Sequence, residues 1–366
     1  MIQVFKPAMH TEAIIEGLRE VLNKGWIGLG PKTKELEEKI GAYLNAKYVT
    51  CVNSGTAALH LAVKSLNLKP ADMVATTPIT FVSTNHALLY ERLTPVFCDV
   101  EPKTGNIDFD SLYKMVTTRP IKAIMVVHIG GYPCEMDKIN ELAKLYEIPV
   151  IEDCAHAFGS SYANGKKVGD SPNICTYSFH AVKNLPMGDG GAVVVNNKKK
   201  DTYFKMMRWL GIDSDTASRS KGSYKWEYNV EKIGLKAHLN DITAIIGLSQ
   251  LKSIDKDNAR RKEIADYYRD NLKAILPDYD DKRKSSCHFY PVFFENREDV
   301  YGALVKNEIY PGMHYKRNDL YEMYEDYPKD DMIHADWYEK HELTLPIHLG
   351  LSNEDLEKIV EVINAV

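Results

Sequence analysis

Residues 177–191 read YSFHAVKNLPMGDGG, and this stretch decides the fold that we expect. An apolar run ends at Phe179, Lys183 follows four residues later, and a glycine-rich turn then leads into a second apolar run. A lysine that directly follows a buried strand can form a Schiff base if its pKa is depressed. Taken alone, the pattern fits a surface lysine in a loop equally well.

Short β-branched runs surround this stretch and alternate with helical patterns from about residue 47 to residue 196. Most of the runs are continuously apolar, as expected of strands that are buried on both faces. We expect strands at residues 47–52, 73–76, 95–99, 123–128, 149–152, 176–179 and 192–195, with helices at 56–66, 108–117 and 136–146 between them. The alternation predicts an α/β fold with a mostly parallel sheet and helices on both faces.

The pattern changes after about residue 200. We expect a helix at 201–210, a polar, basic and aromatic surface loop at 213–228, long helical structure at 240–272, a strand at 288–294 and a helix at 297–308. Residues 353–366 read as an amphipathic helix, with Ser352 and Asp355 spaced as a capping box. We therefore place a large α/β domain at residues 1–250 and a smaller α+β domain at residues 251–366.

Residues 53–58 read NSGTAA and join an expected strand to an expected helix. Small residues such as Gly55 let the backbone approach a ligand, and the free N–H groups at a helix start attract anions. Gly55 and Thr56 are therefore candidates for binding a phosphate. An ordinary strand–helix turn with a serine or threonine cap is the alternative.

Asp153 stands at the end of a buried apolar strand, where an acid is costly unless it has a cationic or protic partner. The carboxylate could hold a proton on a ring nitrogen, bind a metal or cap a helix. We see no matching cluster of histidines and acids, and we therefore expect no metal.

Together, these three stretches supply what pyridoxal 5'-phosphate (PLP) needs. Lys183 would hold the aldehyde, Asp153 would keep the pyridine nitrogen protonated, and the helix start would hold the phosphate. Phe81 could supply an aromatic face for the ring. The chain has no G-x-x-x-x-G-K-[ST] motif and no G-x-G-x-x-G motif after a strand, so the usual nucleotide-binding motifs do not compete with this interpretation.

Composition excludes several other classes of protein. The 366 residues carry a net charge of -5, which gives no general attraction to nucleic acid or to acidic membranes. We see no secretory signal and no apolar run long enough to span a membrane. The six cysteines are scattered without a C-x-x-C pair, which favours reduced, buried thiols and a cytoplasmic protein.

The chain resembles the nucleotide-sugar aminotransferases of the DegT/DnrJ/StrS type, within the fold type I PLP enzymes, nearly from end to end. The resemblance is carried in order by GWIGLGP at 25–31, NSGTAAL at 53–59, PVFCDV at 95–100, EDCAHA at 152–157, SFH at 178–180 with Lys183, NDI at 240–242 and GLSQL at 247–251. It implies a large domain with a seven-stranded, mostly parallel sheet, a smaller C-terminal domain, and a homodimer with active sites at the subunit interface.

The resemblance also implies roles for single residues. Lys183 matches the lysine that carries the cofactor, and Asp153 matches the partner of the pyridine nitrogen. Gly55 and Thr56 match the phosphate-binding turn, which Ser178 also serves. His156 stands where many members have glutamine, facing the cofactor ring and its 3'-oxygen.

One departure concerns residues 234–239, which read GLKAHL where many members have GYNYRM. The family's asparagine reaches the phosphate of the neighbouring subunit's cofactor, and Lys236 could do so with a full charge. The resemblance also suggests contacts to the substrate sugar from Trp26, Ile27, His314 and Tyr315, and contacts to its diphosphate from Arg208, Arg219 and Lys225.

The implied reaction is a ping-pong transfer in which L-glutamate converts PLP to pyridoxamine 5'-phosphate and a nucleotide-linked keto sugar then takes the amine. The expected acceptor is a 4-keto-6-deoxyhexose, giving a 4-amino-4,6-dideoxy sugar for polysaccharide or other amino-sugar biosynthesis. The open alternatives are a 3-keto sugar, a keto-cyclitol, and a regulatory PLP protein without turnover. Dehydratase relatives replace the lysine with histidine, and the presence of Lys183 argues against dehydration.

Overall fold

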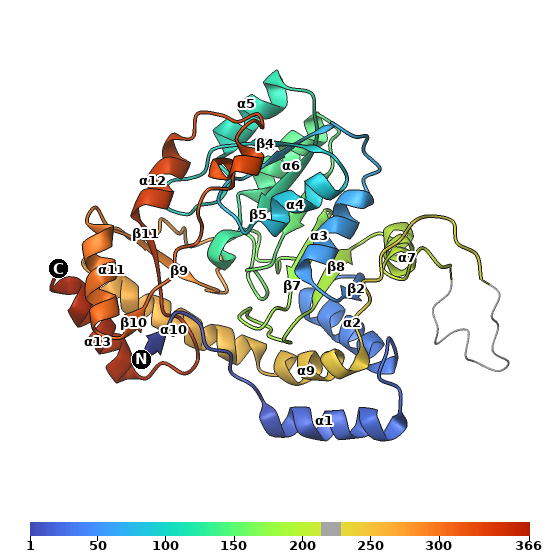
Figure 1. The fold of residues 1–366 in the computed structure, drawn as a ribbon, viewed down its shortest axis with the longest axis horizontal. Helices are drawn as coiled ribbons and strands as arrows, with labels where there is room; N and C mark the ends of the chain where they lie inside the picture. The colour runs from blue at the N-terminus through green and yellow to red at the C-terminus, as the bar shows by residue number, and fades with distance from the viewer. Residues whose placement is uncertain (214–227) are drawn as a thin grey trace.

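A seven-stranded sheet forms the centre of the large domain in the computed structural model, which describes residues 1–213 and 228–366 (Figure 1). Its strands are β2 (Tyr48–Val52), β3 (Met73–Thr76), β4 (Thr94–Phe97), β5 (Ile121–Val127), β6 (Val150–Asp153), β7 (Ile174–Ser178) and β8 (Gly191–Val195). They lie in the order β2-β8-β7-β6-β5-β3-β4. The sheet is parallel from β4 to β7, and β8 runs antiparallel to both β7 and β2.

Two groups of helices bury the two faces of this sheet. One face packs on α2 (Pro31–Leu44), α5 (Phe109–Thr118), α6 (Met136–Leu145) and α9 (Asp241–Leu251), and the other on α3 (Gly55–Lys64), α4 (Ser83–Tyr90) and α7 (Lys198–Met207). Side chains of one strand alternate between the two cores: Ile124 of β5 lies in the first and Met125 in the second. The continuous apolar runs of the sequence are therefore strands covered on both sides.

The amino-terminal helices contact elements that are far from them in the sequence. α1 (Thr11–Lys24) lies against α9. α2 begins after Gly30 without a side-chain cap of its own, and the carboxylate of Asp241 accepts the N–H groups of Gly30, Lys32 and Thr33 at 2.8–3.0 Å. A residue more than 200 positions away thus supplies the cap that the local sequence lacks.

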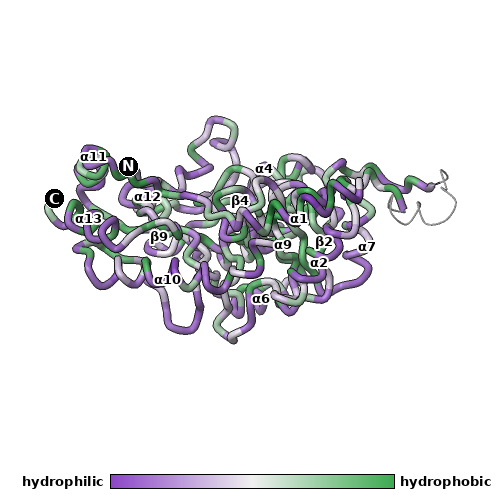
Figure 2. The backbone as a smooth tube through the Cα atoms, turned by 90° about the horizontal axis from the view of Figure 1, so that it is seen from below, coloured by the Kyte–Doolittle hydropathy of each residue, from purple (hydrophilic) through white to green (hydrophobic). Residues whose placement is uncertain are grey.

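The smaller domain lies at one end of an elongated molecule, opposite β2 and α7 (Figure 2). Its core is continuous with large-domain residues such as Phe97 of β4 and Val127 of β5. β9 (Tyr290–Phe293) pairs antiparallel with β11 (Glu342–Leu345), and α10 (Ile254–Asn271), α11 (Arg297–Lys306), α12 (Ile333–His341) and α13 (Asn353–Asn364) surround the pair. The amino terminus departs from the expected division at 1–250. β1 (Ile2–Gln3) pairs with β10 (Ile309–Tyr310), and Ile2 is buried in the core of the smaller domain.

Each of the seven expected strands is present, with ends that differ by up to two residues. The helical stretch expected at 240–272 is two helices, α9 and α10, with a break at Lys252 and Ser253. The capping box at Ser352 is confirmed, because its hydroxyl accepts the Asp355 N–H at 3.1 Å and the Asp355 carboxylate accepts the Ser352 N–H at 3.0 Å. Nearly all of the loop expected at 213–228 lies outside the described residues.

The structure also describes the cysteines and the apolar composition of the helices. All six cysteines are buried and free of disulfides. Within residues 1–213 and 228–366, no helix combines the length and the apolar composition that crossing a membrane requires.

Candidate active site

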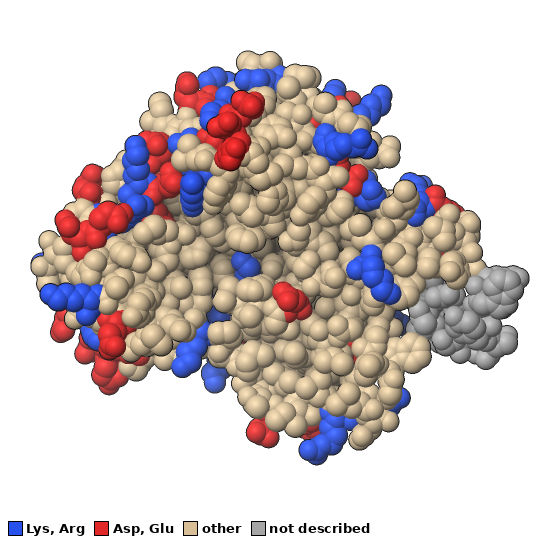
Figure 3. All heavy atoms as spheres, viewed as in Figure 1, with Lys and Arg blue, Asp and Glu red and all other residues tan. Residues whose placement is uncertain are grey.

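A cavity of about 420 Å³ lies at the carboxyl ends of β6 and β7, beside the start of α3. Open α/β sheets bind ligands at this edge, and the volume suits a small molecule. Figure 3 shows the hollow in the middle of one face, with a basic group inside it and most of the charged side chains at the rim of the molecule. Nine of the predicted residues line the cavity, namely Gly55, Thr56, Phe81, Asp153, His156, Ser178, Lys183, His314 and Tyr315.

Lys183 lies in the loop that joins β7 to β8. Its backbone N–H donates to the carbonyl of His180 at 2.9 Å, which fixes the loop at the base of the lysine side chain. Burial lowers the pKa of Lys183 to about 8, and the nearby Asp153 carboxylate opposes part of this shift. About one tenth of the side chain is therefore a neutral, nucleophilic amine at pH 7, far more than for an ordinary lysine.

Asp153 is the last residue of β6, and both of its carboxylate oxygens have partners. The Ala155 N–H donates to Oδ1 at 3.0 Å, and the Thr84 hydroxyl donates to Oδ2 at 2.8 Å. The hydroxyl of Thr80 lies 2.8 Å from that of Thr84 and can donate to it. Burial raises the pKa of Asp153, and these hydrogen bonds oppose the shift. The acid is thus held rigidly in a place where it lacks a full cationic partner.

The start of α3 meets the end of β7. Ser54 caps the helix by accepting the Ala57 N–H at 3.1 Å, which leaves the N–H groups of Gly55 and Thr56 at the open first turn. A Cβ at position 55 would lie 2.7 Å from Cβ of Ser178, so only glycine allows this close approach. The helix start and the Ser178 hydroxyl together form an anion-binding corner.

Aromatic rings from three parts of the chain stack together, and two of them, Phe5 and His156, line the cavity. Phe5, His288 and His156 stack in a column, with ring centroids 5.2 Å apart for the first pair and 4.7 Å for the second. His156 Nε2 lies 3.1 Å from the Tyr315 hydroxyl, and its buried Nδ1 has no partner among the described residues. Burial, with the nearby Lys183 charge, lowers the pKa of His156 well below its usual value, so the ring is neutral.

Phe81 lies on the open side of the cavity and is 58% exposed. A large aromatic face exposed beside a cavity is available to stack on a planar ligand. One cavity thus contains an aromatic face, a lysine, a buried acid and an anion-binding corner. It also contains an imidazole nitrogen that is unpaired among the described residues. These groups match the ring, aldehyde, pyridine nitrogen and phosphate of PLP, and the residues fit this cofactor.

Of the predicted residues that the structure describes, four do not line this cavity: Trp26, Ile27, Lys236 and Arg208. The Trp26 indole donates to the Leu29 carbonyl at 3.0 Å and packs over Gly30, while Ile27 is 50% exposed beside it. Lys236 is exposed, and its amine lies 3.5 Å from the centre of the Trp209 ring. Within this chain, therefore, these side chains do not reach the site.

Arg208 requires a correction. Its side chain is only 6% exposed, where it forms an ion pair with Glu37 and donates to the Cys51 carbonyl at 2.7 Å. The guanidinium is therefore buried and bonded inside the protein, and it is not available to bind a diphosphate. The other two candidates for this role, Arg219 and Lys225, lie outside the described residues.

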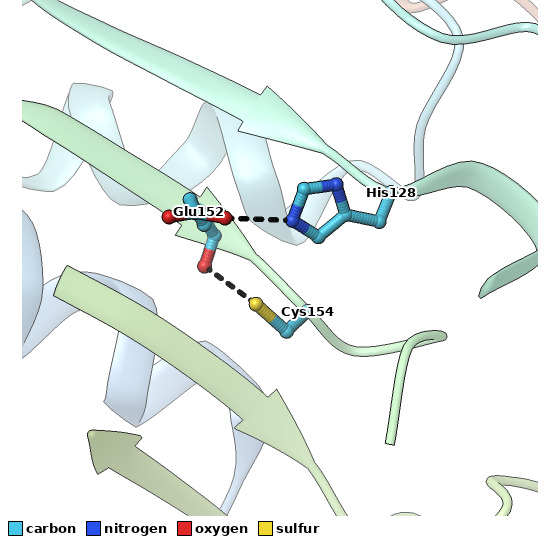
Figure 4. A group of neighbouring side chains, drawn as sticks. All are labelled: His128, Glu152 and Cys154. Carbon is cyan, nitrogen blue, oxygen red and sulfur yellow. Dashed lines mark hydrogen bonds and ion pairs between the residues drawn. The ribbon is translucent and has the colours of Figure 1, made fainter. Parts of the chain in front are cut away.

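His128, Glu152 and Cys154 form a buried group whose atoms lie close enough together to suggest a metal site (Figure 4). The hydrogen bonds argue against one. His128 Nδ1 accepts the Cys134 N–H at 3.1 Å, so Nε2 carries the hydrogen and donates to Glu152 at 2.9 Å. Glu152 also accepts hydrogen bonds from the residues Tyr162, Ser171 and Asn173. Burial would raise the pKa of Glu152, but these donors lower it, so the group is a hydrogen-bonded carboxylate.

Sequence reasoning missed Thr84, Thr80 and Phe5, all of which line the cavity. Thr84 lies three residues after Phe81, and a prediction of α4 would have placed the two side chains near each other. Phe5 carries no such signal, because its position depends on the pairing of β1 with β10.

An α/β sheet with this lysine, acid and helix start in one cavity fits a PLP-dependent enzyme. The chain is similar to the UDP-4-amino-4,6-dideoxy-N-acetyl-beta-L-altrosamine transaminase of Campylobacter jejuni, with 33% identity over 96% of this chain and 94% of that protein. The structure is similar to that of the sugar aminotransferase CalS13 from Micromonospora echinospora, with a TM-score of 0.91, 30% identity and 100% of both chains covered.

The PMP form of Spr1654 from Streptococcus pneumoniae is similar as well, with a TM-score of 0.91, 29% identity, and 99% of this chain and 98% of that chain covered. The sequence model of the DegT/DnrJ/EryC1/StrS aminotransferase family matches residues 8–364. The chain belongs to this family, and it is a PLP-dependent sugar aminotransferase.

Proposed function

We propose that the enzyme moves an amino group from L-glutamate to a nucleotide-linked 4-keto-6-deoxyhexose and makes a 4-amino-4,6-dideoxy sugar. The observation that carries the proposal is the position of Lys183, which lies in one cavity with Asp153 and the start of α3. The Campylobacter jejuni relative, whose name specifies a UDP-linked 4-amino-4,6-dideoxy sugar, supports the choice of acceptor.

The residues that would hold PLP follow from the cavity. Lys183 would bind the aldehyde, Asp153 the pyridine N–H, and the N–H groups of Gly55 and Thr56 with Ser178 the phosphate. Phe81 and His156 would lie against the ring. When bound, PLP supplies an electron sink that stabilises negative charge at the carbon next to the transferred nitrogen.

The chain's own chemistry then depends on one base. A neutral Lys183 takes the proton from Cα of glutamate and, in the second half-reaction, delivers a proton to the former ketone carbon of the sugar. The pKa of about 8 keeps both of its protonation states accessible near neutral pH. Asp153, held by Thr84 and Ala155, would keep the pyridine nitrogen protonated in both half-reactions.

A homodimer would complete the site. Lys236 is exposed and does not line this chain's cavity, and the matching position in the family reaches the neighbouring subunit's cofactor. We therefore assign Lys236 to the partner's phosphate, and Trp26 and Ile27 to a site completed by the partner. A sedimentation experiment in which the protein stays monomeric with cofactor bound would contradict this assignment.

The reaction is tested by following the two half-reactions separately. The PLP-loaded protein is treated with excess L-glutamate, freed of ligand, and mixed with UDP-, GDP- or dTDP-linked 4-keto-6-deoxy sugars while the absorbance of the pyridoxal form is followed. Return of this absorbance with one sugar supports the proposal and identifies the nucleotide. A clean glutamate half-reaction with no return overturns the acceptor and favours a 3-keto sugar or keto-cyclitol. If no amino donor lowers the absorbance of the pyridoxal form, the result would favour a regulatory PLP protein.

A further inference from the structure

His314 brings a neutral imidazole from the smaller domain to the cavity. Its ring stacks on Phe289 with centroids 4.9 Å apart, and a Cβ at Gly312 would lie 2.7 Å from its Cε1. Nδ1 lies 2.8 Å from the Thr344 hydroxyl, while Nε2 has no partner among the described residues. Burial lowers the pKa of His314 to about 4, so the ring carries one hydrogen, either on Nδ1 or on Nε2.

A buried carboxyl group lies behind Thr344. The Thr344 hydroxyl is 2.5 Å from Oε1 of Glu342, and Oε2 of Glu342 accepts the backbone N–H of His314 at 2.8 Å. Glu342 and Thr344 are alternate residues of β11 and so share one face of the strand. The bridge between Gly312 and Thr344 holds the backbone of His314 in register with them. Nδ1 of His314, the hydroxyl of Thr344 and the carboxyl of Glu342 therefore form a continuous line.

This line permits two arrangements of hydrogens. If Glu342 is ionised, the Thr344 hydroxyl donates to the carboxylate, Nδ1–H of His314 donates to Thr344, and Nε2 faces the cavity as an acceptor. If Glu342 is protonated on Oε1, the acid donates to Thr344, whose hydroxyl donates to Nδ1. Nε2 then carries the hydrogen and faces the cavity as a donor.

The surroundings of Glu342 favour the protonated acid. No cation bonds to its carboxyl group among the described residues, and burial raises the pKa of Glu342 to about 8. Arg297 of α11 acts on it only from a distance and in the opposite direction. Other titratable groups also couple to this pair: Tyr279, Tyr315 and Tyr338 to Glu342, and Lys183, His156 and His288 to His314. Burial raises the pKa of the three tyrosines and lowers the pKa of the two histidines.

We propose that Glu342, acting through Thr344, is a positioning residue that keeps the ring hydrogen on the cavity-facing Nε2 of His314, so that His314 donates a hydrogen bond to an oxygen of the keto sugar. The identity of the ligand, a keto sugar, rests on the proposed function. The line of hydrogen bonds from Glu342 to His314 does not depend on it. It separates two roles within the site. Lys183 moves the proton at carbon, and His314 orients the acceptor through a hydrogen that the smaller domain controls.

Three variants distinguish this role from ordinary packing. Glu342→Gln places an amide N–H where the acid O–H stands, and it therefore fixes the donor form of His314 at every pH. Thr344→Val keeps the shape of the side chain but breaks the line. Thr344→Ser keeps the hydroxyl and is the matched control for Thr344→Val.

The first readout is the tautomer of His314, measured by 15N NMR on PLP-loaded protein with labelled histidine and with the signal assigned by His314→Asn. We expect hydrogen on Nε2 in the wild type at pH 7, a change toward Nδ1 as Glu342 ionises above pH 8, and hydrogen on Nε2 throughout in Glu342→Gln. Hydrogen on Nδ1 in the wild type at pH 7, or the same tautomer behaviour in Thr344→Val as in the wild type, would overturn the proposal.

The second readout is kinetic. We expect Thr344→Val to raise KM for the keto sugar about five- to tenfold, with KM for L-glutamate unchanged and Thr344→Ser close to wild type. Equal changes in KM for both substrates would indicate a structural role and overturn the assignment to the sugar. If the protein accepts no keto sugar, the proposed function fails, whereas the tautomer measurement still decides the role of Glu342. A Thr344→Val protein that does not fold leaves the Glu342→Gln titration as the deciding test.

Discussion

Arg208→Met tests whether Arg208 belongs to the interior or to the substrate. Its guanidinium donates to Glu37 and to the Cys51 carbonyl, and the Glu37 carboxylate also accepts the Cys51 N–H at 2.9 Å. Removing the cation leaves the buried Glu37 with a single donor. The loss of one partner from a buried ion pair costs about 3–5 kcal/mol.

The lower end of this range is the better expectation. The buried Nε of Arg208 has no partner among the described residues, and its removal relieves a penalty of about 1 kcal/mol. We therefore expect a loss of about 3 kcal/mol. With an unfolding entropy of roughly 2.1 cal/mol/K per residue, a domain of about 250 residues would lose roughly 6 °C in Tm.

The assay combines thermal melts of the PLP-loaded protein with KM for the nucleotide sugar. We expect Tm to fall and KM to stay within about twofold of wild type. Glu37→Gln combined with Arg208→Met should recover part of the lost stability, because no uncompensated charge remains. Arg19→Met, on the exposed side of α1, is the matched control and should change stability by less than about 0.5 kcal/mol. A tenfold rise in KM with an unchanged Tm would show that Arg208 serves the substrate and would refute the reasoning.

Three further predictions concern the cofactor. Lys183→Ala should abolish the borohydride-reducible PLP adduct and transamination with an unchanged circular dichroism spectrum, and full activity would exclude the assignment of Lys183. Gly55→Ala places a Cβ 2.7 Å from Cβ of Ser178, so fluorescence titration should show about tenfold weaker PLP binding, while Gly28→Ala, which meets no atom within 4 Å, should bind normally. Because only the neutral amine reacts and the pKa of Lys183 is about 8, the rate of PLP capture by the apoprotein should rise about tenfold from pH 6 to pH 7 and level off above pH 8. A rate that kept rising to pH 10 would contradict the lowered pKa.

The local pattern of apolar and polar residues was sufficient to predict the strands of the sheet and the residues at the centre of the site. The apolar runs located each strand of the sheet, and Asp153, Gly55 and Lys183 lie at the end of a run or within five residues after it. Because the carboxyl ends of parallel strands meet at one edge, knowing the strands was enough to bring these residues together. The family's implied roles and this geometry point to the same cavity.

The errors and omissions arise where long-range contacts decide. Arg208, in the helix expected at 201–210, was a candidate contact to the diphosphate, but its place in the interior depends on Glu37, which is 171 positions away. The line from Glu342 to His314 depends on a bridge between Gly312 and Thr344, neither of which belongs to a conspicuous motif. α2 has Pro31 at its first position but no local side-chain cap, since its cap is Asp241.

The antiparallel strand β8 also constrains how the protein can be made. β2 lies at the edge of the sheet, and its one neighbouring strand is β8, which begins at Gly191. During translation, the strand that leads into the phosphate-binding turn therefore has no ladder partner until nearly 150 further residues have left the ribosome. Long sequence separation between paired segments slows folding. The nascent chain must keep an unpaired, apolar β2 soluble over this interval, which makes this segment a candidate site for chaperone engagement.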